Sequence, residues 1–215
     1  MKMIRKLKNH YIAKCNYIKY VKKLPIDDHR IVLESQQGKE FGGNIYYIAK
    51  ELLLNKDYAS FQADICVQKE KIDSARAFYE AKGLSGIHFI ETNTKKYYQA
   101  MASAKYLISD NTFLPYFIKK EGQIYLNTWH GTPLKSLGKS IQNDMHNIGN
   151  TQKNFVYSDY LLYPNSYTRD HMIEDYMLED LCHNTYLMDG YPRNTAFFDE
   201  ETKKEIIEKY SLKGM

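Results

Sequence analysis

From residue 30 onward, short apolar runs alternate with stretches in which apolar residues recur every three or four positions. Each short run predicts a strand, and the longer periodic stretches predict helices. The predicted strands cover residues 30–35, 63–67, 87–91, 106–109, 124–128, 161–163 and 186–188. Strands that alternate with helices form right-handed βαβ units, whose parallel sheet is covered on both faces. The pattern therefore predicts an α/β, Rossmann-like fold.

The helices expected between these strands follow from the same periodicity. Ile45, Ile48, Ala49, Leu52 and Leu53 mark the inner face of the first helix. A second helix is expected at about 72–82, ended by Gly83, and a third at about 94–104.

The first 25 residues form a separate, basic segment. Residues 1–23 carry eight basic side chains and no acidic one. The apolar positions fall on one helical stripe: Ile4, Leu7, Tyr11, Cys15, Ile18 and Val21. A helix ending at about Lys22 could lie in the headgroup region of an anionic membrane, or dock on its own domain with its lysines in water. Residues 134–155, with three lysines among apolar residues, are a second candidate for lipid contact: Lys135, Lys139 and Lys153.

The composition of the chain limits which classes of protein and which kinds of partner remain. A chain of 215 residues that is 43% hydrophobic suits one globular domain of ordinary size. The net charge of +4 hides an acidic remainder, because residues 24–215 carry 22 basic and 26 acidic side chains. With no recognition motif, nucleic acid is not an expected partner. Cys15, Cys66 and Cys182 lie far apart, so we expect neither a disulfide framework nor a metal site. No apolar run reaches the roughly 18 residues of a membrane span, and a cytosolic chain is expected.

Ligands of such folds bind beyond the carboxyl ends of the strands, so the loops that follow strands are the candidate sites. In the loop 35–44, Gly38, Gly42 and Gly43 could bring backbone close to a ligand, or serve turn geometry alone, and Asn44 is expected to cap the next helix. In the loop 110–115, Asp110 or Asn111 is expected to cap a short helix, with a ligand hydroxyl as the alternative partner.

The most informative loop is in residues 124–138, IYLNTWHGTPLKSLG. An apolar strand ends there in Trp129 and His130, and Thr132 and Lys135 add a hydroxyl and a positive charge. An imidazole and a lysine at the tip of a strand could bind and attack a phosphate ester. A structural, hydrogen-bonding histidine is the alternative.

Several motifs in the same order resemble the CDP-glycerol glycerophosphotransferase family of teichoic acid and capsule polymerases and primases. They are TWHGTPLKSLG at 128–138, the preceding 105–127, SDYLLYPNSYT at 158–168 and GYPRN at 190–194. The resemblance implies a GT-B architecture of two facing Rossmann-like domains. It also implies transfer of glycerol phosphate from CDP-glycerol to a lipid-linked poly(glycerol phosphate) acceptor, with release of CMP and no cofactor. Family members that use CDP-ribitol look alike at this level.

The resemblance also implies roles for residues. His130 matches the motif histidine regarded as the family's catalytic base, and Lys135 and Arg193 are candidates to stabilise the transition state. The alternative for Arg193 is a surface arginine or the partner of a carboxylate. The expected substrate-binding residues are Gly38, Gly42, Gly43, Asn111, Trp129, Gly131, Thr132, Lys135 and Arg193. We expect a peripheral enzyme at the cytoplasmic face of the bacterial membrane.

The family pattern continues past GYPRN into a second domain, whereas this sequence ends after a charged helical segment at 200–215. We therefore expect residues 26–199 to form the acceptor-side domain and to transfer glycerol phosphate poorly without a donor-side half. The alternative is a non-catalytic domain that binds a membrane or a partner. A nucleotide-sugar glycosyltransferase shares the architecture, but no feature of the sequence indicates attack at an anomeric carbon.

Overall fold

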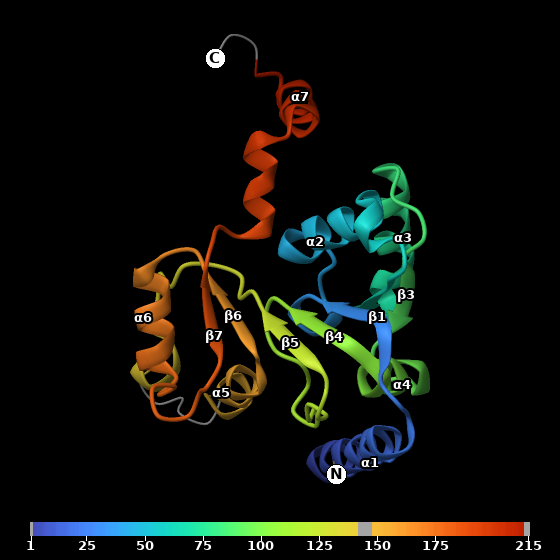
Figure 1. Ribbon diagram of the computed structural model, residues 1–215, viewed down its shortest axis with the longest axis vertical. Helices are drawn as coiled ribbons and strands as arrows, with labels where there is room; N and C mark the ends of the chain where they lie inside the picture. The colour runs from blue at the N-terminus through green and yellow to red at the C-terminus, as the bar shows by residue number, and fades with distance from the viewer. Residues whose placement is uncertain (1, 142–147, 213–215) are drawn as a thin grey trace.

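The computed structural model describes the backbone of residues 2–141 and 148–212, and the side chains from residue 11 onward except that of Glu201. In these residues seven strands form one parallel sheet, in the order β3-β2-β1-β4-β5-β6-β7 (Figure 1). The strands are β1 (Asp27–Glu34), β2 (Gln62–Val67), β3 (His88–Glu91), β4 (Ala104–Ser109), β5 (Ile124–Asn127), β6 (Tyr160–Tyr163) and β7 (Thr185–Met188). The predicted Rossmann-like sheet and all seven predicted strands are confirmed.

The structure contains the three helices that the periodicity predicted between the first four strands, together with helices before β1, between the later strands and after β7. They are α1 (Lys2–Lys23), α2 (Gly43–Leu54), α3 (Ile72–Ala81), α4 (Lys95–Ser103), α5 (Ile148–Tyr157), α6 (Ser166–Asp175) and α7 (Glu200–Lys209), with a 3-10 helix η6 (Pro192–Phe198) before α7. Thr94 caps the amino end of α4 by accepting a hydrogen bond from the Tyr97 amide at 3.3 Å. Gly83, which follows the carboxyl end of α3, has a left-handed backbone with φ +68°. The sequence patterns did not predict α5, α6 or η6.

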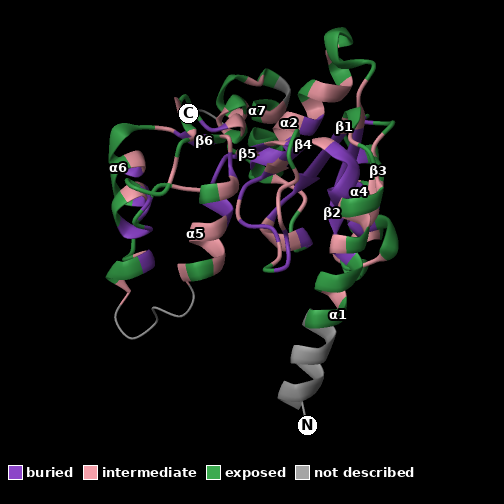
Figure 2. Cartoon of the chain, turned by 60° about the horizontal axis from the view of Figure 1, so that its bottom comes forward, coloured by how far each residue is buried: buried purple, intermediate pink, exposed green. Residues whose placement is uncertain are grey.

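Two hydrophobic layers cover the two faces of the sheet. Ile31 and Leu33 of β1 pack beneath α2 and α3, whereas Val32 packs on the opposite face with α4. Figure 2 shows the buried residues concentrated in the central strands and the exposed ones on the outer sides of the helices. Consecutive residues of β1 are therefore buried on alternate faces, as a strand inside a parallel sheet requires.

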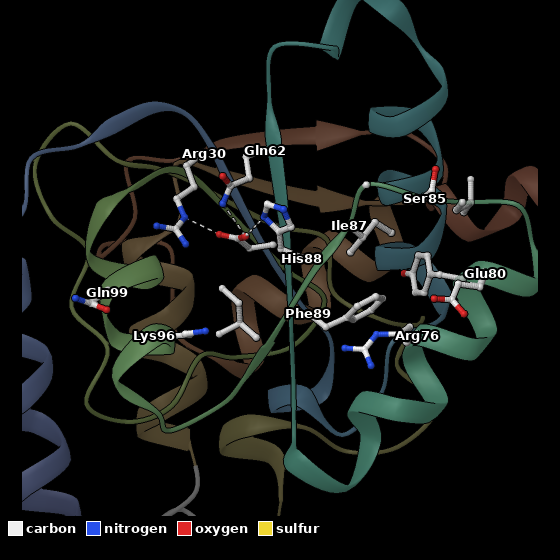
Figure 3. Close-up of a pocket in the computed structure, with 15 residues that line it drawn as sticks. Arg30, Gln62, Arg76, Glu80, Ser85, Ile87, His88, Phe89, Lys96 and Gln99 are labelled. Atoms are coloured by element: carbon white, nitrogen blue, oxygen red, sulfur yellow. Dashed lines mark hydrogen bonds and ion pairs between the residues drawn. The ribbon is translucent and has the colours of Figure 1, made fainter.

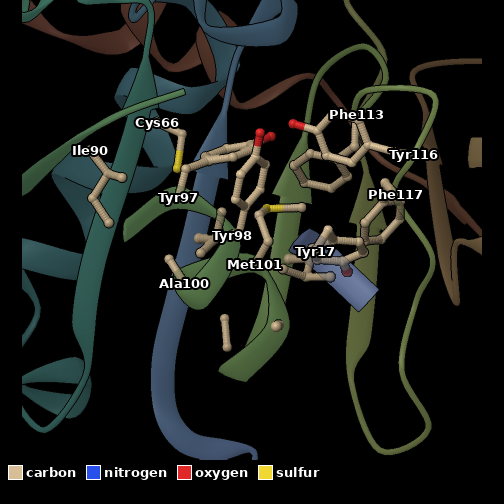
Figure 4. Packing of buried hydrophobic residues seen from close by; sticks show 14 of the residues in the cluster. Tyr17, Cys66, Ile90, Tyr97, Tyr98, Ala100, Met101, Phe113, Tyr116 and Phe117 are labelled. Carbon is tan, nitrogen blue, oxygen red and sulfur yellow. The ribbon is translucent and has the colours of Figure 1, made fainter. Parts of the chain in front are cut away.

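Aromatic rings fill the α4 face (Figure 4). The rings of Tyr98 and Tyr116 meet edge to face at 5.7 Å between centroids, and those of Phe113 and Phe117 lie 4.8 Å apart. Such pairs add about 0.5–1.5 kcal/mol each to the gain from burial.

The basic helix α1 docks on this aromatic layer with a face that the sequence pattern predicted only in part. Tyr17 is 1% exposed and donates a hydrogen bond from its hydroxyl to the Ile118 carbonyl at 2.8 Å. Tyr11 of the predicted stripe is 68% exposed and Cys15 is also exposed, while the side chains of Ile4 and Leu7 lie outside the described residues. Ile18 and Val21 of the predicted stripe are half-buried, and Val21 packs against the aromatic layer. The stripe is therefore correct only in its carboxyl-terminal part, and Tyr17, which it omits, is the most buried residue of the docked face.

The order of the strands creates a switch point beside β1. The chain runs outward from β1 to β2 and β3 on one side, and returns to β4 on the other. The loops that follow β1 and β4 therefore diverge and leave a crevice at the carboxyl ends of the strands. Ser35, which follows β1, donates a hydrogen bond from its hydroxyl to Asp110, which follows β4, at 2.7 Å. This hydrogen bond fixes the floor of the crevice.

The structure also bears on the predicted contacts with a membrane. Within the part of the chain that the structure describes, no helix has both the length and the apolar character needed to cross a bilayer. Of the second candidate segment, 134–155, residues 142–147 lie outside the described residues. Leu134 is 93% exposed, and Lys139 lies 3.5 Å from a carboxylate oxygen of Glu174.

Candidate active site at the switch point

Four segments meet at the carboxyl end of the sheet: the loops after β1, β4 and β5, and the start of η6. They enclose a cavity of about 200 Å³, which we call the His130 cavity. Its lining includes Glu40, Gly42, Gly43, Asn44, Asp110, His130 and Arg193. The structure thus brings together four of the residues predicted from the sequence, namely two glycines, the motif histidine and the arginine of GYPRN.

The imidazole of His130 is held in one orientation. Its Nδ1 lies 2.8 Å from the carbonyl oxygen of Asp110. A carbonyl can only accept, so Nδ1 carries the proton in the neutral ring and Nε2 keeps a free lone pair. The ring also lies 4.2 Å, between centroids, from the indole of Trp129. His130 can therefore accept a proton at Nε2, as a general base must.

The turn that presents His130 is fixed by its neighbours. Trp129 has a left-handed backbone with φ +51°, a conformation that costs energy for a bulky side chain. Asn127 stabilises it by accepting the Trp129 amide at 2.9 Å, and donates its own side-chain amide to the Asn111 carbonyl at 2.6 Å. The Trp129 ring is 7% exposed and packs against Phe155. Trp129 therefore supports the histidine through contact between the two rings, and Asn111 supports the turn through its backbone carbonyl, while its side-chain amide donates to Gln36 Oε1 at 3.2 Å.

Asn44 does not cap the helix, contrary to the prediction. The cap position of α2 is Gly42, and Asn44 is the second residue of the helix. Its buried side-chain amide donates to the Trp129 carbonyl at 2.9 Å and to the Thr128 hydroxyl at 3.2 Å. Its side-chain oxygen accepts the Arg193 backbone amide at 3.2 Å. Its importance was missed because its partners lie 84 to 149 residues away in sequence.

Asp110 does not cap a helix either, because residues 110–117 form turns and irregular structure. Its carboxylate accepts the Ser35 hydroxyl at 2.7 Å and the Gln36 amide at 3.2 Å. Burial raises the pKa of the Asp110 carboxyl, against the opposing effect of these hydrogen bonds and of the nearby His130 and Arg193. The side chain thus ties together the loops after β1 and β4, while its carbonyl orients His130.

The three glycines of the first loop divide into two kinds. A Cβ on Gly38 would lie 2.7 Å from Thr92 Cγ2, and its φ is +77°, so this glycine is required for packing. Gly38 is not among the residues that line the His130 cavity. A Cβ on Gly42 or Gly43 would meet no described atom within 4 Å. The amino end of α2 therefore opens into the cavity, and a helix amino end attracts anions.

The other predicted residues take different places. Arg193 lies at the cavity, and its Nη2 would be 3.8 Å from a Cβ on Gly131. Thr132 and Lys135 are exposed, and the Thr132 hydroxyl accepts a 3.4 Å hydrogen bond from Thr168. Neither residue lines the His130 cavity.

A buried carboxyl group that sequence reasoning missed lies at the end of β1. Glu34 is 0% exposed and accepts the Tyr97 hydroxyl at 2.7 Å, while its Oε1 has no hydrogen-bond partner among the described residues. Burial raises its pKa to about 8, the Tyr97 hydrogen bond opposes this, and Asp110 adds to it. Glu34 is therefore mostly protonated at neutral pH.

A larger cavity lies elsewhere, at the amino ends of β2 and β3 (Figure 3). It has a volume of about 580 Å³ and wraps around the edge strand β3. Arg30, Gln62 and His88 surround the buried Asp64 carboxylate, with Arg30 Nε at 2.5 Å. These groups neutralise one another, so this larger cavity offers less unsatisfied chemistry than the His130 cavity.

Comparison with known proteins gives a consistent family. The model described as CDP-Glycerol:Poly(glycerophosphate) glycerophosphotransferase matches residues 16–214. The teichoic acid poly(glycerol phosphate) polymerase of Bacillus spizizenii strain W23 is 30% identical over 193 residues, which cover 86% of this chain and 46% of the relative. The teichoic acid glycerol-phosphate transferase of Staphylococcus aureus is 26% identical, over 95% of this chain and 50% of the relative.

Solved structures support the same fold. A structure of the wall teichoic acid polymerase TagF superposes with a TM-score of 0.69 at 23% identity, over 97% of this chain and 50% of that chain. A histidine-to-asparagine variant of TagF, soaked with CDPG, superposes equally well. The chain thus spans about half the length of several relatives that it matches, and 27% of the polymerase of Bacillus subtilis strain 168.

Proposed function

The chain belongs to the CDP-glycerol:poly(glycerophosphate) glycerophosphotransferase family, and from that premise we propose that it forms the acceptor-side half of a glycerophosphotransferase active site. The proposed reaction moves glycerol phosphate from CDP-glycerol to the terminal hydroxyl of a lipid-linked polyol phosphate, in teichoic acid or capsule synthesis. The observation that carries the proposal is the orientation of His130: its Nδ1 contacts the Asp110 carbonyl, which leaves the lone pair on Nε2, and the residue lines the same cavity as Arg193 and the amino end of α2.

In the proposed mechanism His130 is the general base. An alcohol is a weak nucleophile at neutral pH, and Nε2 accepts its proton as the oxygen attacks the phosphorus next to glycerol. The bond from that phosphorus to the bridging oxygen breaks, and CMP leaves with the electron pair. The Asp110 carbonyl keeps the proton on Nδ1 before the attack and stabilises the imidazolium after it.

Charge stabilisation comes from two sources in this proposal. The Arg193 guanidinium supplies a cation, and the backbone amides at the start of α2 supply oriented dipoles. Gly42 and Gly43 leave room for phosphate oxygens to approach these amides. Trp129 and Gly131 shape the histidine turn, whereas exposed Thr132 and Lys135 could contact only parts of a substrate outside the cavity.

In this proposal three segments of the chain have different roles. Residues 26–199 form the acceptor-side domain, and 200–215 lead toward the donor-side half of the GT-B cleft. The basic segment 1–25 holds the domain against an anionic membrane on the cytoplasmic side, where the lipid-linked acceptor lies. Tyr11 and Ile12, 68% and 45% exposed, are available for that contact. Flotation with anionic and neutral liposomes tests it: equal recovery with both, or none with either, would refute an electrostatic interaction.

The activity is tested in a chimera in which this chain replaces the matching half of the Staphylococcus aureus transferase. We expect CMP release from CDP-glycerol with a lipid-linked acceptor, and little or none from the purified chain alone. A parallel assay with CDP-ribitol identifies the polyol. Rapid CMP release by the isolated chain would contradict the half-site proposal, as would a folded chimera that uses neither donor.

A further inference from the structure

We propose that Asn44 is a positioning residue, whose side-chain amide sets the His130 turn and the Arg193 turn at a fixed separation across the His130 cavity. The inference rests on the proposed function for its catalytic meaning, but its structural content can be tested without catalysis. Asn44 is 1% exposed, and all of its side-chain hydrogen bonds in the described structure go to these two turns.

The side chain of Asn44 connects the two turns directly. The Asn44 amide nitrogen donates to the Trp129 carbonyl, the peptide group that joins Trp129 to His130. The Asn44 side-chain oxygen accepts the backbone amide of Arg193. One planar group therefore contacts the peptide that leads into the proposed general base, His130, and the backbone of Arg193, the proposed cation.

Position 44 requires a side chain with a particular set of hydrogen-bond donors and acceptors. The position needs two donated hydrogens and one acceptor within one short side chain, which an amide supplies. An aspartate of the same shape keeps the acceptor for Arg193 but loses both donors, and places negative charge against the Trp129 carbonyl. A serine or alanine cannot span the two turns. The requirement thus singles out asparagine.

The Asn44 side chain does not cap helix α2. An asparagine at the start of a helix commonly caps it, yet Gly42 occupies the cap position and no described side chain caps the helix there. The Asn44 amide is committed to the two turns instead. Because Gly42 and Gly43 carry no side chains, the amino end of α2 stays open toward the same cavity. Asn44 thus positions both turns beside that open end.

Replacing Asn44 should affect the rate of the reaction more than the binding of substrate. A displacement of about 1 Å at a reacting group can cost about 100-fold in rate. We expect Asn44→Ala to lower kcat of the active chimera by about this factor, with a smaller change in KM. Asn44→Asp should lower it as far, since the histidine side of the link is lost.

The direct test uses the 215-residue chain with 15N-labelled histidine, and His130→Gln to assign the ring signals. Wild type should show the neutral tautomer with the proton on Nδ1. Both Asn44→Ala and Asn44→Asp should shift the His130 ring signals toward a mixture of tautomers. Gln123→Ala is the matched control, because the buried Gln123 amide also donates to two backbone carbonyls, those of Met101 and Ala104.

Unchanged His130 signals in both folded Asn44 variants would overturn the proposal, as would an equal shift in Gln123→Ala. If Asn44→Ala fails to fold, Asn44→Asp, which keeps the shape and one hydrogen bond, decides the question. Failure of the proposed function would appear differently: phosphotransfer would survive His130→Ala while the Asn44 variants still moved the His130 signals.

Discussion

The backbone of Gly138 lies directly against that of Asp175: a Cβ on Gly138 would lie 2.0 Å from the Asp175 carbonyl oxygen. Gly138 also has φ +48° and is buried, so both space and conformation exclude a side chain. This contact joins the end of the histidine motif to the end of α6. The final glycine of TWHGTPLKSLG therefore serves the fold and not the chemistry.

Gly138→Ala should destabilise the chain by about 2–5 kcal/mol, the combined cost of a strained φ and an overpacked site. Urea unfolding followed by circular dichroism measures the difference. Gly42→Ala is the control, because Gly42 has a negative φ and a Cβ there would meet no described atom within 4 Å. Equal stability of Gly138→Ala and wild type would contradict the close contact.

Glu34 predicts a pH dependence of stability. Its pKa is raised from 4.5 to about 8 by burial, so the folded chain keeps a proton that the unfolded chain releases as pH rises from about 4.5. Stability should therefore fall with rising pH across that window, by at most about 1.4 kcal/mol per pH unit. Glu34→Gln should remove this component of the slope, as measured by urea unfolding between pH 5 and 8.

Glu40→Gln is the control for that measurement, because it neutralises an exposed carboxyl near the same loop. It should retain the wild-type slope. A Glu34→Gln chain whose stability falls with pH as steeply as wild type would show that Glu34 is ionised in the fold.

Arg193 predicts a loss of activity without a loss of stability. Its side chain is exposed at the His130 cavity, and its guanidinium carbon lies 5.3 Å from the centroid of the Tyr191 ring. Arg193→Ala should lower kcat of the chimera by about 10²–10³-fold, as expected for removal of one group that stabilises transition-state charge. Arg76→Ala, an exposed arginine at the opposite end of the sheet, is the matched control. Equal kcat losses in the two variants would contradict the proposed role.

Features that depend on residues close together in the sequence were predictable, and features that depend on contacts between residues far apart in the sequence were not. The strands were predictable because runs such as Ile31–Leu33 of β1 are buried on both faces, and α3 because Gly83 ends it. The docked face of α1 was predictable from periodicity only at Val21, since Tyr17 is buried through an aromatic layer contributed by residues about 100 positions away. Hydropathy does not record such partners.

The candidate site divides in the same way. The motif identified His130, and the position of a loop after a strand indicated the cavity's location. The partners that orient the ring were not predictable, because Asp110 contacts His130 through its carbonyl and Asn44 contacts the turn through a side chain expected to be a cap. Backbone contacts leave no signature in residue type.

The rate of CMP release by the chimera with wild-type His130, His130→Gln and His130→Ala, measured with CDP-glycerol and a lipid-linked acceptor, tests most directly whether His130 is the general base. Both variants should fold, bind CDP-glycerol as wild type does, and lose about 10²–10⁴-fold in kcat, the range for a general base. A His130→Ala chimera that releases CMP at the wild-type rate would exclude this role for His130.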